Sequence, residues 1–336
     1  MNFPLKNKII SDSKINALLK ANRFCDAAIE LQAQQKNEWE LLSKHLNSLK
    51  QTRLKAFQFD SYRIYCQFNP KRFISTSADI SDKTIRNREC FLCVKNLPEE
   101  QKGILIEDKF ILLCNPFPIF NHHFTIAYTE HQPQLIEYHF MDLLSLAEKM
   151  NDRFVVFYNG PLCGASAPDH LHFQAGEKSF LPIYNEFNFI KNRFGKQLIN
   201  LSNFSAFSID DGLRKYFIIE SNDQQIISEY FHKIYLSVKN IYAGEPEPML
   251  NILCDYEKET GWRVLIFPRS QHRSSHYFND GEDKILLSPA SVDIGGVCIL
   301  PREEDFVKIN SLIIKKIFSE VFPAEYIFQK IIINIT

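Results

Sequence analysis

The sequence predicts an α+β fold with two halves related by pseudo-duplication, each an antiparallel sheet with packed helices, plus an N-terminal helical segment. Apolar residues recur at spacings of three and four from residue 13 to about 49, which indicates helices. Strand-like stretches then surround a helical pattern at 135–150, and a weaker echo of this order follows at 214–269. We therefore expect three parts: an N-terminal helical segment at 1–55, a first half at 56–195 and a diverged second half at 196–336.

The first half is expected to contain strands on both sides of its helix. Residues 60–80 alternate like strands broken at the Asn69-Pro70 turn, and 103–131 holds two β-rich stretches around a proline-bearing turn. After the helix, RFVVFYNG at 153–160 and HLHFQAG at 170–176 are two further strands. The expected order is therefore strand, strand, helix, strand, strand.

The second half is expected to repeat this order after a polar boundary at 190–210. RKYFIIES at 214–221 predicts a strand, residues 223–242 a long helix, and MLNILCDY and WRVLIFPR two more strands. A helix near 304–321 is expected to close the half.

Composition and charge exclude several classes of partner. The chain has 336 residues, 45% of them hydrophobic, and 39 basic against 40 acidic residues give a net charge of -1. No broad field therefore attracts nucleic acid or an anionic membrane, and an anionic ligand needs a local site. The start lacks the pattern of a secretory signal and no run approaches the roughly 20 apolar residues of a membrane span, so we expect a cytoplasmic protein.

The run NGPLCGASAPDHLHFQAG at 159–176 carries the clearest chemical signal. In a strand, His170, His172 and Gln174 share one face, and the small residues at 164–167 let backbone amides approach a phosphate. A neutral imidazole is a good nucleophile towards phosphorus, so this combination suits nucleotidyl transfer. The alternative is that the two histidines are structural or surface residues.

A second signal is the pair Cys90 and Cys93 in RECFLCVKN. Two thiolates three residues apart can reach one metal ion while the backbone turns between them. The other six cysteines are spread along the chain and are expected to be reduced, mostly buried residues. The alternative for the pair is two buried thiols.

The 159–176 segment resembles the active-site segment of one branch of the histidine-triad superfamily. That branch contains the galactose-1-phosphate uridylyltransferases, the diadenosine tetraphosphate phosphorylases and the GDP-L-galactose phosphorylases. The resemblance covers about 60–306 and implies two histidine-triad-like halves, with His172 as nucleophile and Gln174 and His170 in the same catalytic motif. The second half lacks the motif, so one active centre per chain is expected. DHLH stands where the uridylyltransferases have His-Pro-His, which puts their specific activity in doubt.

The resemblance also implies a structural zinc ion that braces the strand of the nucleophile. Its ligands would be Cys90, Cys93, His131 and His170, a chemically reasonable tetrahedral set. His122 and His123 are rival ligands, although they lie in an expected turn and resemble substrate-side residues. Alternatively, His131 caps or pairs locally.

Further residues are candidates for binding the substrate. The resemblance places Asn115 at the ribose and Asn159 and Ser166 at the phosphates, and it brings Arg72 towards the nucleotide. Arg269 belongs to PRSQHR at 268–273, where it groups with His272 and Arg273 as a candidate phosphate clamp. The alternatives are ordinary turn chemistry at the asparagines and a solvated loop at the basic cluster.

The identity of Gln174 bears on the reaction. It stands where hydrolytic histidine-triad proteins have a third histidine, and an amide cannot act as a general acid at neutral pH. By resemblance, glutamine accompanies transferases and phosphorylases, in which phosphate or a sugar phosphate discharges the intermediate. We therefore expect a nucleotidyltransferase or phosphorylase that acts on a nucleotide sugar or dinucleoside polyphosphate through a nucleotidyl-His172 intermediate.

Two alternatives to this reaction stay open. One is a hydrolase of the same substrates at the same site, and the other is a zinc-stabilised nucleotide-binding protein without catalysis. The base, the sugar, the acceptor and the oligomeric state are also left open, with a homodimer as one alternative.

Overall fold

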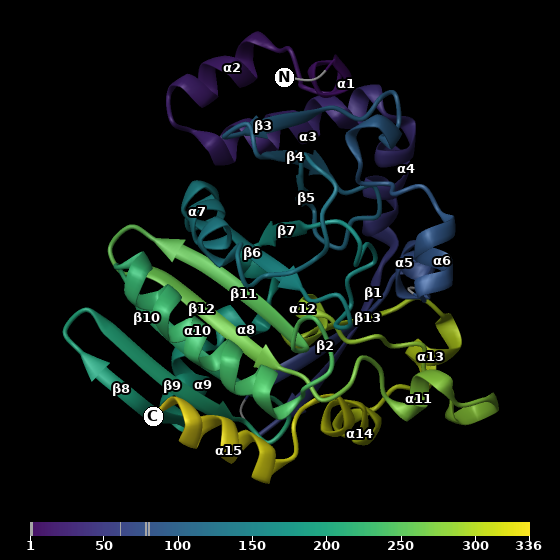
Figure 1. The fold of residues 1–336 in the computed structure, drawn as a ribbon. Coiled ribbons are helices and arrows are strands. Elements are labelled where there is room, and N and C mark those ends of the chain that lie inside the picture. The colour runs from purple at the N-terminus through teal and green to yellow at the C-terminus, as the bar shows by residue number, and fades with distance from the viewer. Residues whose placement is uncertain (1–2, 61, 78, 80) are drawn as a thin grey trace.

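The computed structural model describes residues 3–60, 62–77, 79 and 81–336, and a ten-stranded sheet forms its centre (Figure 1). The strand order is β3-β4-β5-β7-β6-β11-β12-β10-β9-β8, and every neighbouring pair is antiparallel. The strands are β3 (Gly103–Ile106), β4 (Phe110–Cys114), β5 (His123–Tyr128), β6 (Phe154–Asn159), β7 (His172–Glu177), β8 (Gly195–Leu201), β9 (Phe204–Asp210), β10 (Lys215–Ser221), β11 (Leu250–Glu257) and β12 (Gly261–Pro268).

The sheet consists of two five-stranded halves with the same internal order. In chain order, each half arranges its strands as first, second, third, fifth and fourth. The helix between the third and fourth strands is α7 (Phe140–Met150) in the first half and α10 (Gln224–Ile241) in the second. The two fourth strands, β6 and β11, pair with each other and place Asn251 opposite Asn159. This arrangement confirms the predicted pseudo-duplication, while the boundaries of the three parts stay predictions.

Three strands of the large sheet, β3, β4 and β5, precede α7 instead of the expected two, and residues 60–80 are only partly extended. The strand β2 covers Tyr62–Phe68, after which Pro70 opens a 3-10 turn and the short helix α5 (Phe73–Thr76). β2 lies in a separate three-stranded sheet, between β1 (Arg53–Phe59) and β13 (Val297–Leu300). The C-terminal part of the chain therefore packs beside the start of the first half.

The expected boundary at 190–210 is regular structure. It contains the end of α9 (Phe187–Phe194) and the hairpin of β8 and β9 at one edge of the large sheet. In β9, Phe204 and Ala206 are buried at alternate positions. The expected irregular stretch therefore contains the alternating pattern of a half-buried strand. The helix expected near 304–321 is two helices, α13 (Glu303–Lys308) and α14 (Ser311–Val321), because the Asn310 side chain caps a new helix start.

The N-terminal helices confirm the pattern at 13–49 and join the main core. They are α2 (Ser13–Lys20), α3 (Phe24–Glu38) and α4 (Glu40–Ser48), after the short α1 (Phe3–Lys6). Ala27, Ala28 and Leu31 of α3 are fully buried in the cluster that also contains α7. These helices therefore form one end of the same molecule, as Figure 1 shows.

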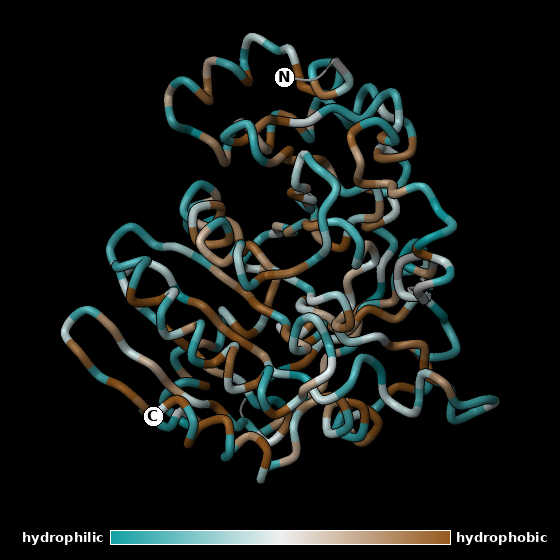
Figure 2. The backbone as a smooth tube through the Cα atoms, viewed as in Figure 1, coloured by the Kyte–Doolittle hydropathy of each residue, from teal (hydrophilic) through white to brown (hydrophobic). Residues whose placement is uncertain are grey.

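Each face of the large sheet is covered by its own apolar layer. One layer contains Leu171 and Phe173 together with residues of α7, α10 and α15 (Glu325–Ile335). The other contains residues of β2, β13 and α14, and apolar segments follow the strands in Figure 2. The remaining short helices are α6 (Asp82–Asn87), α8 (Pro182–Asn185), α11 (Ser275–Phe278) and α12 (Ser291–Ile294).

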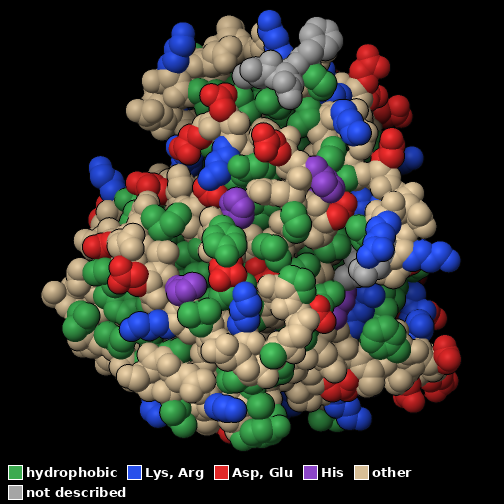
Figure 3. Space-filling model, viewed as in Figure 1, with side chains coloured by type: hydrophobic (Ala, Val, Ile, Leu, Met, Phe, Trp, Pro, Cys, Tyr) green, Lys and Arg blue, Asp and Glu red, His purple; other side chains and the backbone are tan. Residues whose placement is uncertain are grey.

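The face of the molecule in Figure 3 shows no dominance of one charge. Acidic and basic side chains are interspersed over the visible face in Figure 3. In the described part of the chain, no helix has both the length and the apolar character to cross a membrane.

Candidate active site

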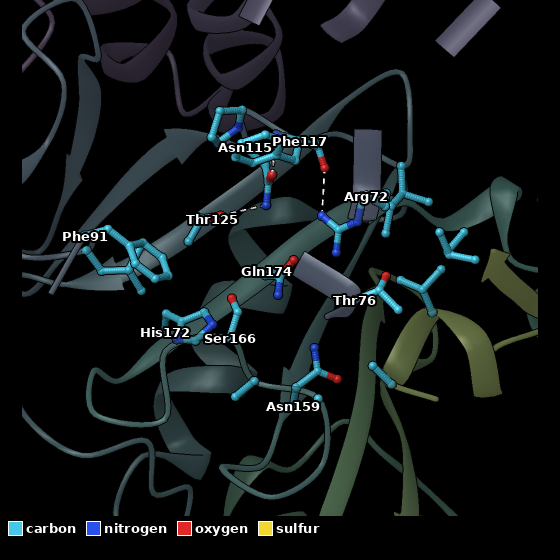
Figure 4. A pocket seen from close by; sticks show the side chains of 18 of the residues that line it. Arg72, Thr76, Phe91, Asn115, Phe117, Thr125, Asn159, Ser166, His172 and Gln174 are labelled. Carbon is cyan, nitrogen blue, oxygen red and sulfur yellow. Dashed lines mark hydrogen bonds between the residues drawn. The ribbon is translucent and has the colours of Figure 1, made fainter. Parts of the chain in front are cut away.

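A cavity of about 450 Å³ lies where β7, the turn after β4, the loop after β6 and the C-terminal segment at 272–299 meet. Its apolar wall includes Trp39 at the start of α4 and the rings of Phe91 and Phe117. Its polar wall includes His172 and Gln174, and Figure 4 shows this wall from close by. The N-terminal helices therefore contribute to the site, which sequence reasoning did not anticipate.

His172 is held in one tautomer with one ring nitrogen free. Its Nδ1 lies 2.8 Å from the carbonyl oxygen of His170, and a carbonyl only accepts, so Nδ1 carries the proton and Nε2 keeps its lone pair. Burial lowers the pKa of His172 to about 4, which leaves the imidazole neutral at pH 7. The side chain of Gln134, which sequence reasoning missed, accepts from the His172 amide at 2.7 Å and donates to its carbonyl at 2.9 Å.

Gln174 is oriented by His123. The Ile119 amide donates to His123 Nδ1 at 3.3 Å, so the proton of His123 is on Nε2, which donates to Gln174 Oε1 at 2.9 Å. The amide nitrogen of Gln174 is therefore left for the cavity. Burial lowers the pKa of His123 to about 3, which keeps the ring neutral.

The loop after β6 supplies donors to the same space. Asn159 Oδ1 accepts from the Ser291 amide at 2.8 Å and from Asn251 Nδ2 at 2.9 Å, so the Asn159 amide nitrogen points into the cavity (Figure 4). Ser166 also lines the cavity. Within the described residues, the backbone amides of Gly164 and Ser166 have no protein acceptor. Such free amides are suited to an anionic group.

Asn115 and Arg72 both line the cavity near the turn after β4. The amide of Asn115 is engaged, since Nδ2 donates to Thr125 Oγ1 at 3.1 Å and Oδ1 accepts from the Phe117 amide at 2.9 Å. Arg72 Nη1 donates to the Phe117 carbonyl at 2.8 Å, while its buried Nε has no partner among the described residues. Burial lowers the pKa of Arg72 to about 10, so the guanidinium stays cationic at pH 7.

Arg269 differs from the expected phosphate clamp. It is fully buried outside the residues that line the cavity, and its guanidinium donates to five protein oxygens. No N–H is left for a ligand. Of the same run, His272 and Arg273 do line the cavity.

Behind His172, four side chains could hold a metal ion. The candidate ligand atoms of Cys90, Cys93, His131 and His170 all lie within 4.8 Å of one another. His170 Nε2 lies 2.8 Å from the Tyr128 carbonyl, so it carries the proton, and Nδ1 faces Cys90 Sγ at 3.3 Å. Two thiols and two imidazoles with free nitrogens fit a tetrahedral zinc ion. His170 thus points at this cluster and not into the cavity.

The rival ligands lie elsewhere. His123 is engaged with Gln174, and His122 Nδ1 lies 2.7 Å from Glu177 Oε1. Outside the four-residue cluster, the described part of the chain shows no other group of this kind. The candidate metal centre is therefore built from Cys90, Cys93, His131 and His170.

Comparisons with known proteins agree with this fold. A family model described as a domain of unknown function (DUF4922) matches residues 31–177, and no curated protein matches the chain. Yeast Ap4A phosphorylase Apa2 has a TM-score of 0.57 at 16% identity, over 85% of this chain and 96% of that chain. The structure of Apa2 in complex with Ap4A has a TM-score of 0.53 at 16% identity, over 86% and 97%. The likeness to Apa2 confirms the predicted α+β fold over most of the chain.

Proposed function

From a fold shared with Ap4A phosphorylase, we propose that this chain is a nucleotidyltransferase or phosphorylase that works through a nucleotidyl-His172 intermediate. The observation that carries the proposal is the His172 ring, whose Nδ1 is bound to a carbonyl and whose free Nε2 belongs to a cavity lined by amide and guanidinium donors. A nucleoside diphosphate derivative combines an electrophilic phosphorus with anionic oxygens, and this wall is complementary to both.

The first step forms a bond from His172 Nε2 to the phosphorus and breaks the bond from phosphorus to the leaving phosphate oxygen, which departs with the electron pair. The imidazole then carries a positive charge, and its Nδ1–H stays bound to the His170 carbonyl, which stabilises that charge. In the second step an oxygen of phosphate or of a sugar phosphate attacks the phosphorus. The P–N bond breaks, and His172 returns to the neutral form.

The other cavity residues hold the phosphoryl oxygens in this proposal. The Asn159 and Gln174 amide nitrogens and the Gly164 and Ser166 amides donate to them, and Arg72 supplies positive charge. The same donors retain the phosphoryl group when the leaving group departs.

The metal centre supports the site from behind. Cys90, Cys93, His131 and His170 would hold a zinc ion, which supplies structural bracing and no redox chemistry. Since the His170 carbonyl fixes the His172 ring, the position of His170 bears directly on the nucleophile.

The test is intact-mass analysis after incubation with nucleotide sugars and dinucleoside polyphosphates, each with and without phosphate or a sugar phosphate. We expect a nucleotidyl adduct on the wild type and on His232→Ala, a histidine of α10 outside the cavity, and none on His172→Ala. Ap4A is included because Apa2 was solved with it. An undiminished adduct on His172→Ala would refute the proposal, and turnover with water alone would make the protein a hydrolase.

A further inference from the structure

A chain of hydrogen bonds joins a buried cation to the cavity. Arg269 Nη1 donates to Asn251 Oδ1 at 2.7 Å, and Asn251 Nδ2 donates to Asn159 Oδ1 at 2.9 Å. The amide nitrogen of Asn159 lines the cavity at the far end (Figure 4). All three side chains are buried, and the chain of hydrogen bonds crosses from the second half of the fold to the first.

The direction of the chain is fixed at both ends. A guanidinium can only donate, so the Asn251 atom that meets Arg269 is the oxygen, and its nitrogen also donates to the Cys163 carbonyl at 2.7 Å. The Ser291 amide likewise only donates, so the Asn159 atom that it meets is the oxygen. The Asn159 nitrogen is therefore the end that faces a ligand.

The charge of Arg269 is not neutralised by a direct partner. Its other acceptors are the carbonyls of Val321, Pro289, Gln271 and His272, and none of its five acceptors is a carboxylate. Arginine stays protonated in proteins, and a charge in a medium of low dielectric constant acts over a longer range than in water. Hydrogen bonds in a chain also polarise one another, which makes the last donor stronger.

We propose that Arg269 is a positioning residue that, through Asn251, turns and polarises the Asn159 amide so that it donates to the phosphate of a bound nucleotide. This inference rests on the proposed function, because it needs a phosphate in the cavity. It assigns to Arg269 an action on the phosphate without contact, in place of the direct contact that the basic cluster suggested. A purely structural arginine would hold together 271–272, Pro289 and Val321 but would have no effect specific to phosphate.

The test compares the binding of each common nucleoside with that of its monophosphate, by calorimetry on the full chain. The dissociation constant of the nucleoside divided by that of the monophosphate measures the contribution of the phosphate, and this quotient is called the ratio below. We expect Arg269→Gln to weaken monophosphate binding about tenfold and nucleoside binding less than about twofold, as loss of a charge-assisted donor predicts. The matched control is Arg214→Gln, which removes another buried arginine that is paired with Asp211 and does not line the cavity, and it should leave the ratio unchanged.

A second variant guards against loss of folding. Asn251→Asp keeps an acceptor for Arg269 but places a negative charge beside it and removes the donor to Asn159, so it should lower the ratio at least as much. In an Asn159→Ala background, Arg269→Gln should have no further effect on monophosphate binding. The proposal is overturned if nucleoside and monophosphate weaken equally, or if the effect persists in that background.

The outcomes separate this inference from the proposed function. A wild type that binds no monophosphate more tightly than its nucleoside refutes both, since the cavity would then hold no phosphate. If the wild type binds a monophosphate more tightly than its nucleoside but the ratio is unchanged in Arg269→Gln and Asn251→Asp, only the positioning role is refuted.

Discussion

The loop that supplies free amides to the cavity depends on Gly164, and its replacement can be predicted quantitatively. Gly164 has φ of +97°, and a Cβ there would lie 2.5 Å from the Cβ of Ala290. The backbone conformation costs a residue with a Cβ about 1–2 kcal/mol. The collision adds about 1–3 kcal/mol, since the Cα of Ala290 also lies 3.3 Å from the added Cβ and the backbone must move to relieve the contact. We therefore expect Gly164→Ala to lower the free energy of unfolding by about 2–5 kcal/mol.

Two further variants separate the two costs. Gly212 has φ of +78° and no atom within 4 Å of its Cβ position, so Gly212→Ala should show only the conformational cost of about 1–2 kcal/mol. Adding Ala290→Gly to Gly164→Ala removes the collision and should restore about 1–3 kcal/mol, though not full stability.

Urea unfolding with linear extrapolation measures these differences, and monophosphate binding reports on the loop itself. We expect Gly164→Ala to weaken monophosphate binding and Gly212→Ala to leave it unchanged. The reasoning fails if Gly164→Ala is as stable as the wild type, or if Ala290→Gly does not improve it.

Three other predictions concern His123, Glu247 and the candidate metal centre. His123→Ala should slow formation of the nucleotidyl adduct about tenfold or more, because the Gln174 amide that His123 orients can then rotate. His122→Ala should not slow it, and a time course of intact mass measures both variants. Burial raises the pKa of Glu247 to about 8, so the native state binds more protons than the unfolded state between about pH 4.5 and 8. The free energy of unfolding should therefore fall as the pH rises through this range, by at most about 1.4 kcal/mol per pH unit. Glu247→Gln should flatten this slope in unfolding measurements. Removal of metal by a chelator should lower Tm by about 2 °C or more, and a metal-free wild type of equal Tm would contradict this. In elemental analysis, Cys93→Ser should lose the metal while Cys25→Ser keeps it.

The sequence predicted the repeated halves and the place of His172 beside Gln174 because both have a local signature. Alternation in HLHFQ indicated that His172 and Gln174 share a face, and both line the cavity. His170 was expected on the same face, but it precedes β7, and its ring turns to the cysteines. The joining of Cys90 with His131 came from the resemblance, since spacing alone does not bring distant residues together.

The parts of the site that were missed have no such signature. Gln134 lies in the polar run HQPQ and Asn251 is a single polar residue among apolar neighbours. Only the tertiary fold shows that they bind the residues around His172 and Asn159. Arg269 was expected at the phosphate because charge and neighbours do not reveal which arginine of a run is buried. β12 ends at Pro268, and the next residue, Arg269, is buried, whereas Arg273 lines the cavity.

The pairing of β6 with β11 also has a consequence for synthesis and folding. A ribosome releases the strand that ends in Asn159 long before Asn251 and Ser291, which fix its amide. Pairing between strands so far apart in the chain closes a large loop and is slow. The nascent first half therefore contains His172 before the Asn159 amide is fixed, and under the proposed function nucleotide binding should emerge only after residues 251–291 have docked.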